Sequence, residues 1–407
     1  MRDGPGIVGY VVSTWPRLSQ TFVVSEILAL ERAGMRLEIF SVKRPEPEPV
    51  HDGVARVRAP VSYLTFHGRW KAILSANLVQ LRRQPRRYLR LLVLALSYRS
   101  VGVLRHVLRA AYLADLLRDH GIVRQHAHFA TAPTLVAMFA SEMTGVPYSF
   151  TAHARDIYVD TRPALLRRQI ERARVVVTIS EYNRRYLSDI SAGANGKVRC
   201  IYNGLDLREF TVGAAEPAGR GTPVVLTVGR LVEKKGLADL VGAVAVLRER
   251  GRAVSVEIIG SGPLRGELES LIVRSQLSGT VRLLGAQAPQ SVRAAYRRAT
   301  VFALPCVVTA EGDRDGIPTV LLEAMASGVP VISTPVSGVS ELIDSRRNGI
   351  LVEPGQPIAL ADALEELLED AGLRKRLARA GRITVEDRFS IDRSAGELIA
   401  LFREGGA

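Results

Sequence analysis

Short runs of β-branched and apolar residues alternate along the chain with longer segments whose apolar residues recur at helical spacing. This alternation is typical of βαβ units and parallel sheets. In the first half it predicts strands over residues 7–13, 37–42, 123–129, 148–151 and 175–179. The helices expected between them cover 22–32, 133–144, 163–172 and 181–187.

The second half repeats the alternation after a polar, glycine-rich stretch at 213–222, which we interpret as a linker or exposed loop. The predicted strands are 224–228, 255–259, 281–284, 301–304 and 329–333. The predicted helices are 237–250, 264–275, 291–298 and 319–326, followed by a charged helical tail over 359–403. Both halves therefore indicate an α/β fold.

Composition agrees with two folded cores. The chain has 407 residues, of which 47% are hydrophobic and 24% charged, and this excludes full-length disorder. The long uncharged run at 324–340 is interrupted by glycine and proline, and the N-terminus lacks a secretory apolar region, so we expect neither a membrane span nor a leader. Cys200 and Cys306 are too few for a disulfide framework and suit a reducing cytoplasm.

The positive charge is concentrated in one segment. Net charge is +14, and residues 69–118 hold eleven basic residues and a single acid, Asp115, for a local net charge of +10. Leucine and arginine interleave there at helical spacing, and we expect Pro85 and Gly102 to break the segment into pieces. A basic amphipathic hairpin on an anionic membrane surface and a pair of covering helices with a solvated arginine face both stay open. Few aromatic residues interleave, which disfavours nucleic-acid binding.

A loop and the start of a helix are predicted at 315–323, which reads Asp-Gly-Ile-Pro-Thr-Val-Leu-Leu-Glu. Gly316 permits a tight turn, and Pro318 suits the first position of a helix. The free N–H groups and partial positive charge of a helix start suit a diphosphate. Glu323 lies roughly 7.5 Å further along the axis, where it can accept hydrogen bonds from ribose hydroxyls. Asp315 can reach a sugar beyond the phosphates, although an acid beside a helix start is also common without a ligand.

Two further turns point to the same chemistry. In 228–236, Arg230 offers a bidentate fork and Lys235 a point charge, a pair suited to two phosphates unless the turn is merely solvated. The turn at 259–263, Ile-Gly-Ser-Gly-Pro, lets backbone N–H groups approach a ligand closely. All three turns follow strands of one predicted parallel sheet, and ligands of open α/β sheets bind at that edge. Their coincidence is stronger evidence than any one of them.

The first half offers polar groups at strand ends. His153 leaves a strand three residues before Asp156, where it can donate to a substrate oxygen or simply be a satisfied surface histidine. The loop at 13–21 joins the first strand to the first helix, and we expect its hydroxyls and amides to face the same cleft as His153.

Two patterns resemble metal motifs. His126 and His128 place both rings on one face of a strand, but no matching third ligand is evident, and we interpret the pair as structural. Asp313-Arg314-Asp315 resembles an Asp-x-Asp motif, and we interpret Asp315 as a hydroxyl acceptor instead. We expect no metal.

Taken together, these motifs resemble the retaining family-4 glycosyltransferases of GT-B fold over nearly the whole chain. The residues that carry the resemblance are Gly229-Arg230 with Lys235-Gly236, Gly260-Ser261-Gly262-Pro263, Asp315-x7-Glu323-Ala-Met-Ala-Ser-Gly328, Val177-Thr-Ile-Ser-Glu181 and Ile201-Tyr-Asn-Gly-Leu-Asp206 with Phe210. Residues 15–23, His126-Ala-His-Phe and Phe150-Thr-Ala-His153 resemble a subgroup that assembles bacterial exopolysaccharides of the colanic-acid and amylovoran type.

The resemblance implies two Rossmann-like domains, each with a parallel sheet, and a cleft between them. It places an acceptor-side domain at 1–205 and a donor domain at 206–389, with the final helix at 390–407 packed back on the first domain. It implies a hexosyl-type transferase that uses a nucleotide-diphosphate sugar as co-substrate, with no cofactor and no metal. The implied acceptor is a glycan or lipid-linked saccharide of the cell envelope. The implied location is cytoplasmic, with 69–118 available to an anionic membrane on its inner face.

The resemblance also implies roles for individual residues. Arg230 and Lys235 neutralise the donor diphosphate, His153 contacts the donor sugar near the reacting carbon, and Asp315 holds that sugar and the distal phosphate. These four are the implied catalytic residues. The implied donor-binding residues are Gly229, Gly260, Ser261, Gly262, Gly316, Ile317, Pro318, Thr319 and Glu323, and the acceptor-side residues are Ser19, Gln20, Thr21 and Asp156.

Two departures from the family pattern leave the substrates open. The family usually has Glu where this chain has Asp315, which is one methylene shorter, so the donor sugar is open. The first loop lacks the paired glycines of many members, and Gln20 stands where the subgroup often has Glu, so the acceptor is open as well. A sugar-nucleotide epimerase and a non-catalytic nucleotide-sugar or lipid-binding protein remain alternatives. An epimerase would lack an acceptor site, and product analysis with donor alone would identify it.

Overall fold

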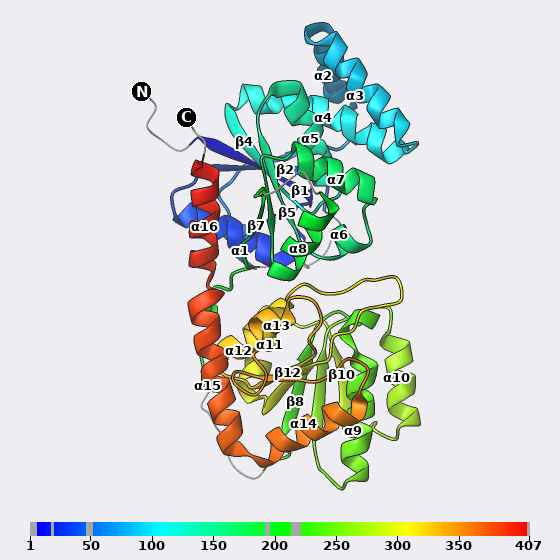
Figure 1. Cartoon of the computed structure of the whole chain (residues 1–407), viewed down its shortest axis with the longest axis vertical. Coiled ribbons are helices and arrows are strands. Elements are labelled where there is room, and N and C mark those ends of the chain that lie inside the picture. The colour runs from blue at the N-terminus through cyan, green and yellow to red at the C-terminus, as the bar shows by residue number, and fades with distance from the viewer. Residues whose placement is uncertain (1–5, 18–19, 46–51, 192–195, 213–220, 405–407) are drawn as a thin grey trace. The chain divides into compact units, whose positions relative to one another are not determined.

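The computed structural model describes residues 6–17, 20–45, 52–191, 196–212 and 221–404. The chain forms two compact units, each an α/β layer structure with its own hydrophobic core (Figure 1). The first unit holds residues 1–179, 183–201 and 394–407, and the second holds 180–182 and 202–393. The predicted α/β class with two Rossmann-like domains is confirmed.

The first unit is built on a seven-stranded parallel sheet with the order β3-β2-β1-β4-β5-β6-β7. Its strands are β1 (Ile7–Thr14), β2 (Leu37–Lys43), β3 (Val61–Tyr63), β4 (Ile122–His128), β5 (Tyr148–Ala152), β6 (Val175–Thr178) and β7 (Val198–Cys200). Its helices are α1 (Thr21–Arg32), η2 (Asp52–Arg56), α2 (Trp70–Arg83), α3 (Pro85–Ser97), α4 (Val101–Asp119), α5 (Ala132–Thr144), α6 (Arg155–Tyr158), α7 (Pro163–Arg172), α8 (Glu181–Ile190) and α16 (Ile391–Arg403). Helix α16 joins this unit from residue 394 onward, and Phe402 packs on Tyr10 and His126.

The second unit is built on a six-stranded parallel sheet with the order β10-β9-β8-β11-β12-β13. Its strands are β8 (Val224–Val228), β9 (Ser255–Ile259), β10 (Val281–Gly285), β11 (Val301–Leu304), β12 (Val331–Ser333) and β13 (Ile350–Leu351). Its helices are η3 (Leu207–Glu209), η4 (Glu233–Lys235), α9 (Leu237–Glu249), α10 (Arg265–Arg274), α11 (Pro289–Arg298), α12 (Thr319–Ala326), α13 (Val339–Leu342), α14 (Pro357–Glu369) and α15 (Ala371–Arg388). The inner face of α9 is apolar, with Leu240, Val244 and Leu247 fully buried, as its periodicity predicts.

Three details differ from the sequence-based prediction. The edge strands β3, β7 and β13 have only two or three residues and leave no periodic pattern. The second break in the basic segment comes at residues 98–100, where Arg99 has a φ of 48°, and Gly102 lies inside the first turn of α4. The tail is three helices rather than one pattern, because Asp370 caps the start of α15 through a hydrogen bond to the Leu373 N–H.

The hairpin of α2 and α3 packs on α4 through a small polar network. Asn77 donates to the Leu108 carbonyl, and Gln80 donates to Asp115 at 3.0 Å. Arg118 closes the network by pairing with Asp115 at 2.7 Å. Asp115, the single acid of the basic segment, is thus engaged by Gln80 and Arg118 where the hairpin packs on α4. Within the part of the chain that the structure describes, no helix is both long and apolar enough to cross a membrane.

Candidate active site

Three loops meet at the carboxyl edge of the second unit's sheet. They follow β8, β9 and β11, which lie side by side with β8 in the middle. The Leu231 N–H donates to the Ser261 carbonyl at 3.0 Å, which ties the first loop to the second. The Val307 N–H donates to the Lys234 carbonyl at 3.0 Å, which ties the first loop to the third. The convergence predicted from the three turns is present in the structure.

Backbone contact sets the spacing of the first two loops. A Cβ on Gly260 would lie 1.8 Å from the Gly229 carbonyl oxygen, and Gly260 has a φ of 146°. A Cβ on Gly262 would lie 2.4 Å from the Leu231 carbonyl oxygen. Only glycine fits either position, because the colliding atoms are backbone and cannot rotate away.

A buried cluster of charges connects the first and third loops. Lys235 Nζ lies 2.6 Å from Asp315 Oδ2, while Lys234 Nζ lies 3.0 Å from Asp313 and 3.4 Å from Asp315. The lysine side chains are 6% and 11% exposed, so their charges are largely removed from water. Two cations and two carboxylates therefore share one desolvated site, and Arg230, which is exposed, adds a third cation.

The pair of Lys235 and Asp315 is ionised. Burial opposes the charge on Lys235, but the carboxylate of Asp315 outweighs it, and the pKa of the ammonium is raised. Burial likewise opposes the charge on Asp315, but Lys235 and Lys234 outweigh it and lower the pKa of this carboxyl. Arg230 is near enough to act on Lys235 in the opposite direction, which places its charge in the same site.

Helix α12 begins at the third loop. Pro318 occupies the capping position with an extended backbone, and Thr319 is the first helical residue, so the sequence prediction for Pro318 is wrong by one position. The φ of Pro318, −62°, still pre-sets the entry to the helix. Gly316 and Ile317, immediately before it, are buried. The N–H groups of the first turn thus begin next to the lysine and aspartate cluster.

Glu323 projects from the second turn of α12. Its Oε2 accepts a hydrogen bond from the Tyr296 hydroxyl at 2.9 Å, a partner on α11 that the sequence did not reveal. Burial raises the pKa of Glu323, although Tyr296 and Arg293 act in the opposite direction. A carboxyl held this way keeps its second oxygen to accept a hydrogen bond.

In the first unit, Asp156 shapes the loop that carries His153. Its carboxylate accepts the backbone N–H groups of Ala130 at 2.8 Å, Ala154 at 2.8 Å and His153 at 3.1 Å. Burial raises the pKa of Asp156, and these N–H groups act against that effect. The side chain therefore positions the ends of β4 and β5 relative to each other.

The His153 ring lies in an aromatic setting. Its centroid is 4.5 Å from that of Phe129 and 4.8 Å from that of Phe22, and its Nε2 lies 3.3 Å from His128 Nδ1. Burial, followed by the neighbouring His128 and His126, lowers the pKa of His153 well below the ordinary value. The ring is therefore neutral. Phe129 adopts a φ of 72°, a conformation that is uncommon and costly for a bulky residue.

The pair His126 and His128 gains a third polar partner, Glu26 of α1, that sequence spacing did not indicate. Glu26 Oε1 lies 3.0 Å from His128 Nε2 and accepts the Tyr10 hydroxyl at 2.8 Å. One ligand atom from each of Glu26, His126 and His128 falls within 4.8 Å of the others, a spacing that a metal ion could use. These atoms already have protein partners, because His126 also contacts the hydroxyls of Ser149 and Thr151.

This network bears on which nitrogen of His153 carries the proton. Burial would raise the pKa of Glu26, but His128 outweighs it and lowers that pKa, so the carboxylate is ionised and accepts the proton of His128 Nε2. In the neutral form of the His128 ring, Nδ1 is then an acceptor, and His153 Nε2 donates to it. The remaining nitrogen of His153, Nδ1, carries a lone pair and can accept a hydrogen bond from a hydroxyl.

The acceptor-side candidates lie at the start of α1. Gln20 is the residue before the helix and is 9% exposed, and Thr21 is its first residue. Phe22, next along the chain, contacts the His153 ring, which places this helix start beside β5. Ser19 lies outside the described residues. The structure thus gathers Gln20, Thr21, Asp156 and His153 in the first unit and all the donor-side candidates in the second.

Comparison with known proteins finds one family model over each half of the chain. Residues 19–209 match the family model described as Glycosyltransferase Family 4, and residues 214–384 match that described as Glycosyl transferases group 1. The colanic acid biosynthesis glycosyltransferase WcaL of Escherichia coli K12 is 27% identical over 97% of this chain and 99% of its own length. The amylovoran biosynthesis glycosyltransferase AmsK of Erwinia amylovora is 36% identical over 41% of each chain.

A solved structure shares the fold of the whole chain. The Anabaena protein Alr3699/HepE, crystallised with UDP, superposes with a TM-score of 0.76 at 17% identity and covers 98% of this chain and 100% of its own. At that identity the likeness concerns the fold.

Proposed function

Because the chain belongs to the family-4, group 1 glycosyltransferases, we propose that it transfers a sugar with retention from a nucleotide-diphosphate sugar to a hydroxyl of a glycan, lipid-linked saccharide or other glycoconjugate. The observation that carries the proposal is the convergence of the three loops of the second unit around Lys235, Asp315 and the start of α12. Cations, backbone N–H groups and a hydroxyl acceptor meet there within one site. This is the chemistry that a diphosphate joined to a sugar requires.

The leaving group determines what the second unit must do. The nucleoside diphosphate departs with negative charge, and Lys235, Arg230 and the N-terminus of α12 stabilise that charge without a metal. Gly229, Gly260, Ser261 and Gly262 bring backbone close to the nucleotide. Glu323 holds the ribose, and Asp315 with the N–H groups of Gly316 and Ile317 holds the donor sugar. We assign no protein nucleophile, and a donor phosphate oxygen helps to deprotonate the acceptor.

His153 contributes a neutral contact to the donor sugar. Its Nδ1 accepts a hydrogen bond from a sugar hydroxyl, because His128 occupies its Nε2. Gln20 and Thr21 belong to the acceptor side, and Asp156 acts there by holding the His153 loop. Preorganised polar groups stabilise developing charge best in a site that excludes water. We propose that the residues at the donor pyrophosphate and at these sugar contacts have this role.

The substrates of relatives narrow the donors to test. HepE was crystallised with UDP, and a mannosyltransferase of Mycobacterium tuberculosis that is 31% identical over 59% of this chain is described as GDP-mannose-dependent. We therefore propose a uridine or guanosine diphosphate sugar as donor. WcaL and AmsK favour a polysaccharide of the cell envelope as the product.

A donor panel tests the proposal. Melting temperatures are measured with UDP-, GDP- and dTDP-sugars for the wild type and for Arg230→Ala/Lys235→Ala. Two lost charge-assisted contacts of about 1.5–3 kcal/mol each should weaken donor binding about 100-fold or more. Arg274→Ala/Arg376→Ala removes equal charge from exposed positions on α10 and α15 and should bind donor like the wild type. Wild-type donor affinity in the first variant would overturn the proposal.

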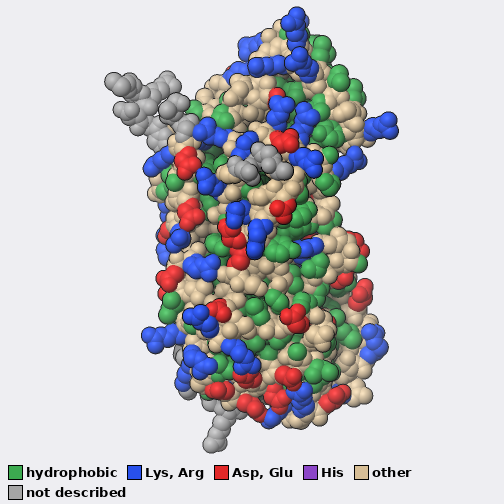
Figure 2. Space-filling model, viewed as in Figure 1, with side chains coloured by type: hydrophobic (Ala, Val, Ile, Leu, Met, Phe, Trp, Pro, Cys, Tyr) green, Lys and Arg blue, Asp and Glu red, His purple; other side chains and the backbone are tan. Residues whose placement is uncertain are grey.

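We also propose that the hairpin of α2 and α3 rests on an anionic membrane. Its outer side exposes large apolar residues at helical spacing: Trp70, Leu74 and Leu78 on α2, and Leu89, Val93 and Leu96 on α3. The exposed fraction reaches 67% at Val93. A helix whose only role is to cover the sheet does not need to expose that much apolar surface to water. Figure 2 shows basic and apolar side chains lying side by side over these helices. An apolar stripe flanked by arginines favours the membrane interpretation over a solvated face.

A further inference from the structure

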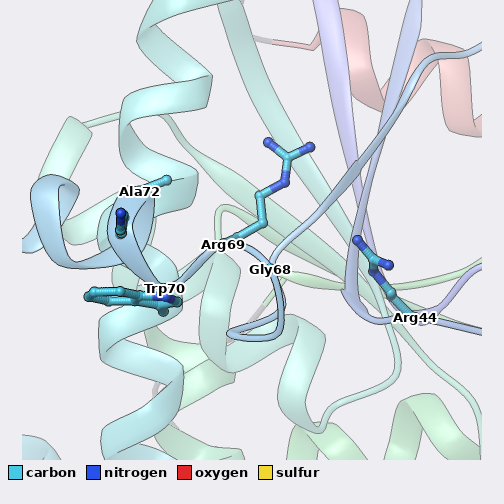
Figure 3. Close-up of a pocket in the computed structure, with 6 residues that line it drawn as sticks. Arg44, Gly68, Arg69, Trp70 and Ala72 are labelled. Atoms are coloured by element: carbon cyan, nitrogen blue, oxygen red, sulfur yellow. The ribbon is translucent and has the colours of Figure 1, made fainter.

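A cavity of about 610 Å³ opens in the first unit where β2 ends and α2 begins. It is lined by Arg44, Gly68, Arg69, Trp70, Lys71 and Ala72 (Figure 3). Three of the six residues are cations and none is acidic. Gly68 has a φ of 72°, and a Cβ built on it would lie 3.9 Å from the Arg44 guanidinium, so the turn and this cation are close neighbours.

Among the residues that the structure describes, the partners of these cations are two aromatic rings and a hydroxyl group. The Arg44 guanidinium lies 5.8 Å from the centre of the Tyr63 ring, and Lys71 Nζ lies 5.6 Å from that of Trp70. Arg69 donates one N–H to the Tyr112 hydroxyl at 3.1 Å. Such partners orient a charge without neutralising it. Within the described part of the chain, the lining therefore keeps its positive charge for a ligand.

The neighbourhood carries the same sign of charge. Burial, together with the nearby Arg109 and Lys43, lowers the pKa of His106 on α4 to about 4. The Arg109 guanidinium lies 5.2 Å from the Phe66 ring, two residues before Gly68, and its buried Nε has no hydrogen-bond partner within the described structure. Asp115, the one acid of the segment, is paired with Arg118. This is a positive potential that attracts an anion.

Trp70 belongs both to the cavity and to the exposed apolar stripe of α2. Its side chain is 57% exposed, and the stripe continues from it through Leu74 and Leu78. A ligand that fits both features has an anionic head and a hydrocarbon tail. The first turn of a helix leaves N–H groups without a partner inside the helix, and at the start of α2 such groups would suit a phosphate.

The cavity lies at the same sheet edge as the His153 site. Strands β3, β2, β1, β4 and β5 run parallel in that order, so the residues after their carboxyl ends share one edge. The Tyr63 hydroxyl, beside the cavity, donates to the Trp15 carbonyl in the loop that leads to Gln20 and Thr21. Three strand spacings of about 4.8 Å separate β2 from β5, or roughly 14 Å. A short saccharide, rather than a single sugar, spans that distance.

We propose that Arg44, Arg69 and Lys71 bind the diphosphate of a lipid-linked saccharide acceptor, with its hydrocarbon chain along α2 and its free sugar end directed toward His153. This assignment rests on the proposed function, which it extends from the donor to the acceptor. The shared chemistry is a phosphate ester at a lipid surface, and a phospholipid headgroup would offer it too. The cavity selects the diphosphate because it presents three cations rather than one.

Vesicle binding tests the assignment without requiring transfer. Three sets of phosphatidylcholine vesicles are compared: plain, with a few per cent of a prenyl diphosphate, and with phosphatidylglycerol at equal charge. Arg44→Gln/Arg69→Gln removes two lining cations and keeps the apolar stripe. Arg274→Gln/Arg376→Gln removes equal charge from exposed positions on α10 and α15.

The wild type and the control variant should bind the diphosphate vesicles at least about tenfold more tightly than plain ones. Arg44→Gln/Arg69→Gln should lose most of that gain and keep its binding to phosphatidylglycerol. Equal losses on both anionic vesicles would overturn the diphosphate in favour of a headgroup phosphate. Binding equal to the control on both would overturn the site itself. Donor-induced melting shifts on the same variant report separately on the proposed function, so the two failures are distinguishable.

Discussion

Lys235 and Asp315 form a buried ion pair, with Nζ and Oδ2 2.6 Å apart, at the place where we propose that the donor diphosphate binds. The positive charge of Lys235 is therefore partly neutralised before a ligand binds. A diphosphate that enters must share Lys235 with the carboxylate, and Lys234 and Arg230 supply the additional positive charge that makes this sharing favourable.

Asp315→Asn should destabilise the free protein and enlarge its response to ligand. The substitution leaves Lys235 and Lys234 without their shared carboxylate, and breaking a buried pair costs about 3–5 kcal/mol. UDP then supplies the missing negative charge, so its stabilising effect should exceed that on the wild type. Calorimetric melting with and without UDP measures both changes. A UDP-induced shift smaller than the wild-type shift would show that the pair does not lie at the diphosphate site.

Gly260→Ala should abolish donor binding. The added methyl meets the Gly229 carbonyl oxygen at 1.8 Å, so the two loops must separate. Gly266→Ala is the matched control, because a Cβ at that position on α10 meets nothing within 4 Å and should stabilise the helix by roughly 0.5–1 kcal/mol. Titration calorimetry with UDP compares the two. Unchanged UDP affinity in Gly260→Ala would mean that the nucleotide does not depend on this contact.

Leu89→Ser/Val93→Ser should weaken binding to vesicles that contain phosphatidylglycerol. Both side chains are more than half exposed, and each loses about 1.5–3 kcal/mol of burial in the lipid interface. The fold should be unaffected, since neither side chain contributes to the buried face of α3. Sedimentation with vesicles at two salt concentrations separates the apolar from the charge contribution. If the variant sediments like the wild type, the hairpin is a solvated surface.

The first unit should lose stability as the pH falls below about 6.5. Burial, followed by His128, lowers the pKa of His126 to about 3, and the pKa of His153 is lowered as well. The unfolded chain binds protons on these rings below about pH 6.5 while the folded chain does not, so stability falls with falling pH by roughly 1.4 kcal/mol per unit for each buried ring.

His126→Gln provides the control for this pH dependence. It removes one of the rings whose pKa burial lowers, so the change in unfolding free energy between pH 6.5 and pH 5 should be reduced by roughly the contribution of one ring. Unfolding in urea at several pH values gives the slopes. Equal slopes for the variant and the wild type would contradict a neutral buried His126.

Removal of metal should leave both stability and transfer unchanged. The ligand atoms of Glu26, His126 and His128 are close enough for an ion, but hydrogen bonds already engage them. The proposed donor site uses cationic side chains for the charge that a metal would otherwise carry. Elemental analysis measures the bound metal. Melting and transfer assays after chelation measure stability and activity. A bound ion whose loss lowers the melting temperature would show that Glu26, His126 and His128 form a metal site rather than a hydrogen-bonded network.

The sequence predicted the features that depend on local pattern. The strand-to-helix turns at 228–236, 259–263 and 315–323 have glycine, charge and strand signals within a few residues, and the structure brings them together. Partners that lie far apart in the chain were missed. Glu26 is 102 residues from His128, and Tyr296 is 27 residues from Glu323, and helix periodicity says nothing about either pairing. Short edge strands were missed as well, because two or three residues cannot show a repeat.

The contact between Gly229 and Gly260 limits how this protein can evolve. Two main chains touch there, so no exchange of side chains can widen or narrow that edge of the site without separating the strands beneath it. A change of preferred base or sugar must instead arise in the side chains that follow the glycines or in those around Glu323. The backbone contact would then be inherited unchanged, while the surrounding side chains change the substrate selectivity.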